Sequence, residues 1–142
     1  MTHARWTLTA VLLLLVSASV LLAQGATYKS HLSPMPVDAN SQAATTGTGT
    51  VTATLRGTTL SLTGTFSGLQ KPATTANLHV GPRGIPGPAQ IPVTVTKATS
   101  GTISGELMLS AAQVDHLKRG RLYLQIQSEA APEGNLRGWL LQ

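Results

Sequence analysis

A stretch from Gly47 to Leu69, GTGTVTATLRGTTLSLTGTFSGL, constrains the fold more than any other part of the chain. Small or apolar residues alternate with threonine and serine in two successive runs, and Arg56-Gly57-Thr58 separates the runs. A period of two places alternate side chains on opposite faces of a strand, and threonine suits the solvent face of an antiparallel sheet. Gly57 can adopt the positive φ that a tight turn needs. The stretch therefore predicts a β-hairpin with one apolar face and one hydroxyl-rich face.

The first 25 residues predict a separate segment, a secretory signal peptide. A weakly basic start with Arg5 precedes an apolar run from Leu8 to Leu22, and the small residues Ala23 and Gly25 follow it. Small residues at these two places predict cleavage before Ala26, with cleavage after Ala23 as the alternative. The apolar run is shorter than the ~20 residues of a membrane-spanning helix, so an uncleaved anchor is the less favoured reading. We expect a secreted, periplasmic or cell-envelope protein that contacts a membrane only through this segment before cleavage.

Charge and cysteine content restrict the partners of the chain. It has no cysteine, and its 10 Lys and Arg against 5 Asp and Glu give a formal net charge of +5. An exported chain without cysteine must be stabilised by sheet packing rather than by disulfides. The mild positive charge favours weak attraction to anionic surfaces such as envelope polymers. Nucleic-acid binding is not expected, because the basic residues are scattered and do not form a stripe with stacking aromatics.

The rest of the chain predicts short strands and loops. Alternation of apolar and polar residues predicts further strands at Ala26–Leu32 (an edge strand), Ala76–Val80, Ile91–Thr96, Gly101–Leu109, Leu122–Gln127 and Leu136–Leu141. The segment Gly81 to Pro92, GPRGIPGPAQIP, has three Gly-x-y triplets, far too few for a collagen helix. Its composition predicts a surface loop, and a second loop is predicted at Glu129–Gly134.

One helix is predicted, from Ser110 to Arg119. Ser110 and Gln113 have the spacing of a capping box, and Gly120 follows where a left-handed C-terminal cap is needed. About seven strands and one short helix predict an all-β domain, an antiparallel β-sandwich of the immunoglobulin-like kind.

Three segments in this order carry a family resemblance: Ser67-Gly68-Leu69, then Leu109 to Tyr123, then Leu136-Arg137-Gly138. Together they make the chain resemble the CHRD domain, a secreted β-rich module first named from chordin and also found in bacterial exported proteins. The resemblance covers the whole chain after the leader, so we expect a single CHRD-like domain at 26–142. The resemblance implies structural motif positions at Gly68, Leu69, Gly81, Gly120, Arg137 and Gly138. It also implies a protein ligand, and the mild positive charge makes an envelope polymer the other candidate.

The departures from the family concern polar residues. Family members often carry His-x-His before the Gly-Pro of the glycine-rich loop, whereas this chain has Leu78 and Val80, with His79 on the opposite face. A further family histidine matches Gln127, and the glutamate before Leu-Arg-Gly is Asn135. A metal or polar site built from the family histidines is therefore not carried over to this chain.

The sequence offers few residues that could form a catalytic or metal-binding site. After the leader the histidines are His31, His79 and His116, on different predicted elements, whereas a zinc or copper site needs three or four converging ligands. The His-x-His strand of Cu/Zn superoxide dismutases is similar to the family motif, so a degenerate metalloprotein of that sandwich type is the alternative function. No serine lies in a Gly-x-Ser-x-Gly turn. We therefore expect no catalytic residue, metal or cofactor, and a non-catalytic binding or structural module whose loops bind the ligand.

The sequence also predicts where several polar and aromatic side chains lie. His79 is expected to be a partly exposed strand residue and His116 a solvent-facing helix residue. Arg137 is expected on the outer face, paired with a carboxylate such as Glu106 or Glu129. Polysaccharide binding is a third hypothesis, which depends on the few aromatic residues that could stack on sugars. These are Tyr28, Tyr123 and Trp139.

Overall fold

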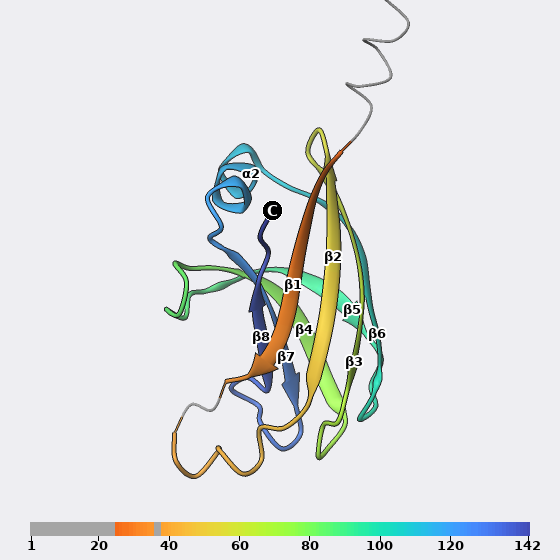
Figure 1. Cartoon of the computed structure of the whole chain (residues 1–142), viewed down its shortest axis with the longest axis vertical. Coiled ribbons are helices and arrows are strands. Elements are labelled where there is room, and N and C mark those ends of the chain that lie inside the picture. Colours follow the sequence, from red (N-terminus) through yellow and green to blue (C-terminus); the bar gives the residue numbers. More distant parts are fainter. Residues whose placement is uncertain (1–24, 36–37) are drawn as a thin grey trace, which may run out of the picture.

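The computed structural model describes residues 25–35 and 38–142, and this part of the chain contains eight strands and one helix. The strands are β1 (Ala26–Pro34), β2 (Thr48–Arg56), β3 (Thr59–Ser67), β4 (Ala73–Val80), β5 (Ala89–Val95), β6 (Gly101–Met108), β7 (Leu122–Ser128) and β8 (Leu136–Trp139), and the helix is α2 (Ala111–Lys118). Figure 1 shows their arrangement. The predicted signal segment lies, except for Gly25, outside the described residues.

The β2–β3 hairpin forms as the alternation predicts. Its strands pair in register from Thr48 opposite Ser67 to Arg56 opposite Thr59, and Gly57 in the turn has a φ of 62°. The apolar residues of both strands face a common core, whereas most of the threonines face solvent. The hairpin, its turn and its two faces are therefore confirmed.

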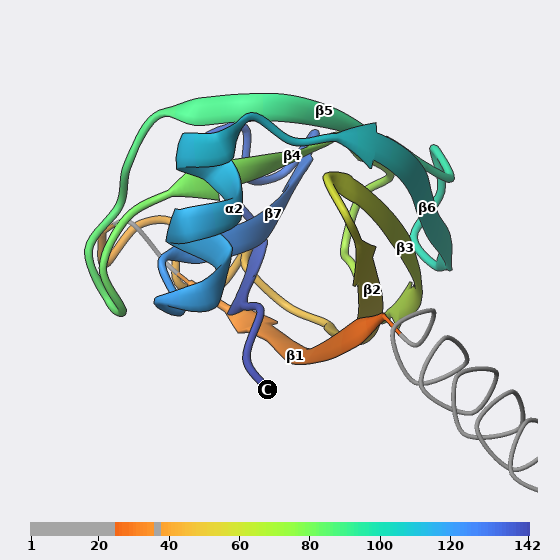
Figure 2. The ribbon, with the colours of Figure 1, turned by 90° about the horizontal axis from the view of Figure 1, so that it is seen from above.

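The sheet closes into a barrel, so the predicted sandwich is wrong although the all-β antiparallel class is confirmed. Among the described residues the strand order is β1-β2-β3-β6-β5-β4-β7-β8, with every neighbouring pair antiparallel. β1, predicted as an edge strand, pairs with β2 on one side and β8 on the other, and β5 likewise joins β4 to β6. These two strands connect what would otherwise be two separate sheets, as the view along the barrel in Figure 2 shows.

The interior of the barrel is filled by one apolar cluster with members from every described strand and from α2. An eight-stranded barrel is just wide enough for side chains to fill it, so this cluster is the core rather than the wall of a channel. Gly138 faces this interior where β8 passes β1. A Cβ atom there would lie 2.2 Å from Ser30 Oγ and 2.4 Å from the His31 carbonyl oxygen, so the close approach of the two strands requires glycine.

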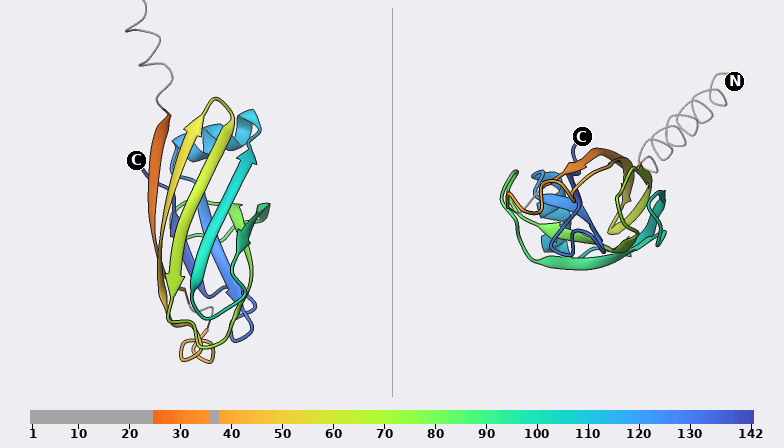
Figure 3. Two further views of the ribbon diagram at one scale, coloured as in Figure 1. Left: turned by 90° about the vertical axis from the view of Figure 1, so that its right-hand side faces the viewer. Right: turned by 90° about the horizontal axis from the view of Figure 1, so that it is seen from below.

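Helix α2 lies at one end of the barrel (Figure 3). Ser110 is its N-cap, and the predicted capping box with Gln113 is present: Gln113 N donates to Ser110 Oγ at 3.2 Å, and Ser110 N donates to Gln113 Oε1 at 2.8 Å. Leu117 packs into the core, and Gly120 follows with a φ of 67°. None of the helices in the described part of the chain has the length and apolar character needed to cross a membrane.

The outer face of β7 differs from the prediction. Alternation places Tyr123 and Gln125 on a solvent face, but both are buried, as are the inward residues of the strand. The loop of residues 81–88 folds back over Tyr123, whereas the loop before β8 covers Gln125, whose Nε2 donates to the Glu133 carbonyl at 3.3 Å. Gly87 N lies 2.8 Å from the Tyr123 hydroxyl, and Gly81 N donates to the Arg121 carbonyl at 2.9 Å. This part of the wall is therefore covered on both faces.

Candidate functional site

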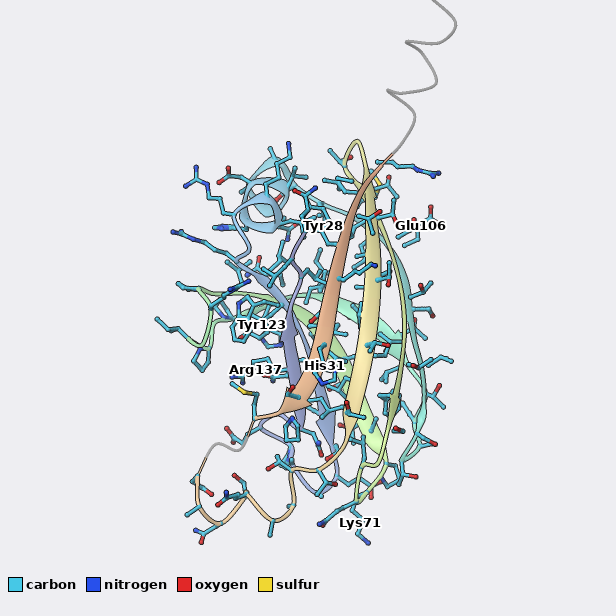
Figure 4. The ribbon with its side chains drawn as sticks, in the orientation of Figure 1. Tyr28, His31, Lys71, Glu106, Tyr123 and Arg137 are labelled. Atoms are coloured by element: carbon cyan, nitrogen blue, oxygen red, sulfur yellow. The ribbon has the colours of Figure 1, made fainter. Side chains whose placement is uncertain are left out.

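Strands β4, β7 and β8 place two rows of side chains on the outside of the barrel. Residues paired in register across neighbouring strands lie on the same face and contact one another. The upper row consists of His79, Tyr123 and Trp139, and the lower row consists of Asn77, Gln125 and Arg137. In Figure 4, Tyr123 and Arg137 lie on the side of the barrel where the 81–88 loop emerges, and Glu106 lies on the opposite side.

The upper row holds the 81–88 loop. The rings of His79 and Tyr123 stack with centroids 5.0 Å apart, and those of Tyr123 and Trp139 lie 4.7 Å apart. The Tyr123 hydroxyl accepts from Gly87 N at 2.8 Å and donates to Gly87 O at 3.0 Å. Trp139 Nε1 donates to the Gly81 carbonyl at 2.9 Å. The loop is thus fixed at both ends by side chains of the barrel wall.

His79 is a buried residue with one unsatisfied nitrogen. Only 7% of it is exposed, so the expectation of a partly exposed histidine is wrong, because the loop covers it. Its Nδ1 lies 2.9 Å from Gly87 O. A carbonyl oxygen only accepts, so Nδ1 carries a proton and Nε2 is the ring nitrogen left for another partner. That atom is buried without a hydrogen-bond partner.

Arg137 lies in the lower row with a single hydrogen-bonding partner. Its Nε and Nη2 both donate to Gln125 Oε1, at 2.9 and 2.6 Å, and its guanidinium carbon lies 5.4 Å from the centroid of the Tyr123 ring. The predicted pairing with Glu106 or Glu129 is wrong. Within the described residues the ion pair present is that of Arg119 with Asp115, which leaves the Arg137 charge, only 9% exposed, without a carboxylate.

These residues border a polar hollow of about 350 Å³. Its lining is His79, Pro86, Gly87, Tyr123, Gln125, Gln127, Pro132, Glu133 and Arg137. Both loops predicted as binding sites, at 81–92 and 129–134, thus contribute residues to it. Gln127 Oε1 accepts from Thr75 Oγ1 and from Asn77 Nδ2, and its amide nitrogen makes no hydrogen bond to the residues that the structure describes. Glu133 adds an exposed carboxylate at the rim.

The motif positions implied by the family resemblance fall in different places. Gly68, with a φ of 77°, and the buried Leu69 follow β3, and Gly120 ends α2. A Cβ atom on Gly81 would lie 2.6 Å from the Ile85 carbonyl oxygen, so this glycine shapes the start of the loop. Of the six positions only Gly81 and Arg137 belong to the surroundings of the polar hollow, while Gly138 faces the core.

The described part of the chain contains no group of three His, Cys, Asp or Glu side chains that could hold a metal ion. His31 is exposed, with Nε2 3.5 Å from Thr48 Oγ1, and His116 is half-buried on α2 rather than fully solvent-facing. Leu78, in register with a family histidine, is buried inside the barrel.

A second hollow, of about 450 Å³, lies beside the C-terminal end of α2. Four exposed cations border it: Arg83, Lys118, Arg119 and Arg121. The sequence explains Lys118 and Arg119 through the helix dipole, but Arg83 comes from the 81–88 loop, far away in sequence, and the fold brings it beside them. The positive charge that appears scattered in the sequence is thus partly gathered on this surface.

Sequence reasoning assigned Tyr123, Gln125 and Gln127 to a solvent face and so missed their part in the site. The signal was present, since a Gly/Pro-rich segment directly follows the strand that ends at Val80. A loop that starts at the end of one strand can fold back over the neighbouring strand, but its direction is not encoded in a pattern of alternation. The stacking candidates for sugars are also affected, because Tyr28 and Tyr123 are buried and Trp139 is half-buried beneath the loop.

Comparison with protein families gives one match: the model of the CHRD domain matches residues 28–140. The comparisons with curated proteins and with solved structures gave no match. The matched range begins within β1 and ends just after β8, so it contains both strands of the β1–β8 seam. The chain belongs to the CHRD domain family.

Proposed function

We propose that this protein is an exported, non-catalytic binding module that acts at the cell envelope or outside the cell, with the polar hollow as its ligand site. Membership of the CHRD family supports a binding or structural role. The observation that carries the proposal is a pair of incompletely compensated polar groups in the wall of the hollow. These are the Arg137 guanidinium, which has no carboxylate partner, and His79 Nε2, which has no hydrogen bond.

Such groups are costly in a purely structural wall. Burial of a polar atom without a partner costs about 1–3 kcal/mol, and burial of an uncompensated charge costs more. Apolar side chains of the same volume would make the outer face of β7 and β8 more stable. A ligand that supplies the missing partners gives these residues a function, and loops on a rigid scaffold are the common place for such a site.

The lining of the hollow supports binding rather than catalysis. It contains no serine, cysteine or lysine that His79 could activate, and the Nδ1 of His79 is committed to the Gly87 carbonyl. A nucleophile needs a base within hydrogen-bond reach, and the base needs a group that orients it. Glu133 and His79 border the same hollow, but within residues 25–35 and 38–142 neither side chain has a hydrogen bond to a hydroxyl or thiol.

Export and location rest on the leader-like sequence before Ala26 and on the positive charge of the chain. The four cations around the second hollow add to the attraction for anionic envelope polymers, which falls as salt screens it.

The experiment expresses the full chain in a bacterial host and measures the N-terminus of the recovered protein by intact mass. We expect a chain that starts at Ala26 in the extracytoplasmic fraction.

Co-sedimentation of this protein with isolated envelope material then tests whether the polar hollow binds a ligand. Pro132→Trp fills the hollow from its rim and should abolish co-sedimentation, whereas Pro34→Trp, an exposed proline of β1 outside the lining, should not. Retention inside the cell with residues 1–25 attached, or equal sedimentation of both variants, would contradict the proposal.

A further inference from the structure

We infer that the polar hollow recognises a carboxylate group, with Arg137 as its charged anchor. This inference rests on the proposed function, because it names the chemistry of the ligand for the same site. Its basis is a nearly buried cation that is held rigidly and has no carboxylate partner, in the same hollow as the neutral amide donor of Gln127.

Arg137 has donors to spare. A guanidinium carries five N–H donors in a planar fork, and the two described hydrogen bonds both go to the same oxygen, Gln125 Oε1. An amide oxygen carries a dipole and no net charge, so it balances the cation only in part. A carboxylate from outside would accept the remaining donors and compensate the charge, as in other Arg–carboxylate pairs.

The guanidinium is also positioned in advance. Gln125 fixes one edge of the group, and the Tyr123 ring lies beneath it at 5.4 Å. Tyr123 is itself held by the Gly87 backbone on the loop above. A group already fixed in its binding geometry loses little conformational entropy when a ligand arrives.

The surroundings favour a carboxylate over a phosphate. Arg137 is the one cation in the lining, and Gln127 contributes a neutral amide donor. Glu133 at the rim carries a negative charge, and its repulsion grows with the charge of the ligand, so it opposes a doubly charged phosphate more than a singly charged carboxylate. The site therefore suits an anion of one charge with two oxygens in a plane, which is the geometry that the arginine fork matches.

The test uses Trp139 as a probe beside the site, where its ring contacts that of Tyr123 in the lining. The chain has two tryptophans, and Trp6→Phe leaves Trp139, two residues from Arg137 on the same face of β8, as the fluorophore whether or not the leader is cleaved. We expect saturable quenching or enhancement with propionate and none with its neutral isostere propionamide. Inorganic phosphate should bind at least tenfold more weakly than propionate. Equal responses to propionate and propionamide, or tighter binding of phosphate, would overturn the carboxylate assignment.

Two variants assign the response to Arg137. Arg137→Met should abolish the propionate response, and Arg56→Met, at an exposed arginine of the hairpin, should leave it unchanged. Since Arg137→Met also alters packing, Gln125→Glu gives an independent test of the same size and shape. It places a carboxylate within 3 Å of the Arg137 fork, so it should occupy the site from within and reduce propionate affinity at least tenfold. The melting temperature is not the readout, because the variant also loses the hydrogen bond from Gln125 Nε2 to the Glu133 carbonyl. Unchanged propionate affinity in this variant would overturn the inference.

The two proposals fail separately. If propionate does not bind but co-sedimentation with envelope material still depends on Pro132, the hollow is a ligand site of other chemistry. If propionate binds and envelope material does not, the anion site exists while the proposed role at the envelope is wrong.

Discussion

Gly138 lies where β8 passes close to β1, and this approach is possible because glycine has no Cβ atom. The Cβ of an alanine there would lie 2.4 Å from the backbone carbonyl oxygen of His31, an atom that cannot move without shifting the strand. We expect Gly138→Ala to lower the free energy of unfolding by about 2–3 kcal/mol, as overpacking of a tight core does. Urea denaturation measures this loss.

The matched control is Gly105→Ala in β6. Its nearest neighbour would be Leu107 Cδ2, at 3.3 Å, the far end of a flexible side chain. We expect a change of less than about 1 kcal/mol there, in either direction. Similar losses for the two substitutions would show that the approach of β1 and β8 is not the reason for glycine in the Leu-Arg-Gly motif.

At the scale of elements, the 81–88 loop and strand β7 depend on each other through Tyr123. Tyr123→Phe removes the hydroxyl that both accepts from and donates to Gly87, so a backbone donor of the loop loses its partner. We expect a loss of about 1–2 kcal/mol in the free energy of unfolding. We also expect faster trypsin cleavage after Arg83, which is exposed in this loop. Limited proteolysis followed by mass spectrometry measures the rate.

Tyr28→Phe is the control for this prediction. Tyr28 is as well buried as Tyr123, but its hydroxyl has no hydrogen bond among the described residues. The same substitution there should leave the cleavage rate after Arg83 unchanged. Equal acceleration in both variants would mean that loss of general stability, rather than release of the loop, exposes the site.

Elements with a complete local signature were predictable from the sequence. The β2–β3 hairpin follows from alternation around Gly57, and α2 follows from Ser110, Gln113 and the glycine after the helix. The outer face of β7 was not predictable in the same way, because its burial depends on where two loops fold, 81–88 over Tyr123 and 129–134 over Gln125. The partner of Arg137 was missed for a related reason. Alternation placed it correctly on the outer face, but the register that brings it opposite Gln125, far from Glu106, is a property of strand pairing.

At the scale of the whole molecule, the two features that the sequence left open are the closure of the barrel and the site outside it. Closure needs β1 to pair with β2 along its length and with β8 near its end, and nothing within residues 26–34 distinguishes this strand from an edge strand. The site follows from closure, since the β4–β7–β8 part of the wall carries the buried polar residues on its outside. The apolar filling of the interior leaves the outer wall and its loops as the place for recognition.

Closure predicts how the molecule opens. In a sandwich, edge strands exchange their amide hydrogens faster than central strands, because they can fray without disturbing the core. Here Lys29 N donates to Leu141 O at 2.7 Å, and Leu141 N donates to Lys29 O at 3.0 Å, so β1 has no free edge at this point. We therefore expect the Lys29 and Leu141 amides to exchange only through global unfolding. Their protection in native-state hydrogen exchange should equal that of the β2–β3 hairpin.

The internal reference is the Ile85 amide, which donates to the Pro82 carbonyl at 3.0 Å within the exposed loop. Its hydrogen bond is of similar length, but it can break through local opening, so it should exchange much faster than the seam amides. Protection of Lys29 and Leu141 that matches Ile85 rather than the hairpin would mean that the β1–β8 seam opens by itself. The molecule would then behave as two sheets in contact, and the rigid wall that holds Arg137 in place would be lost each time the seam opened.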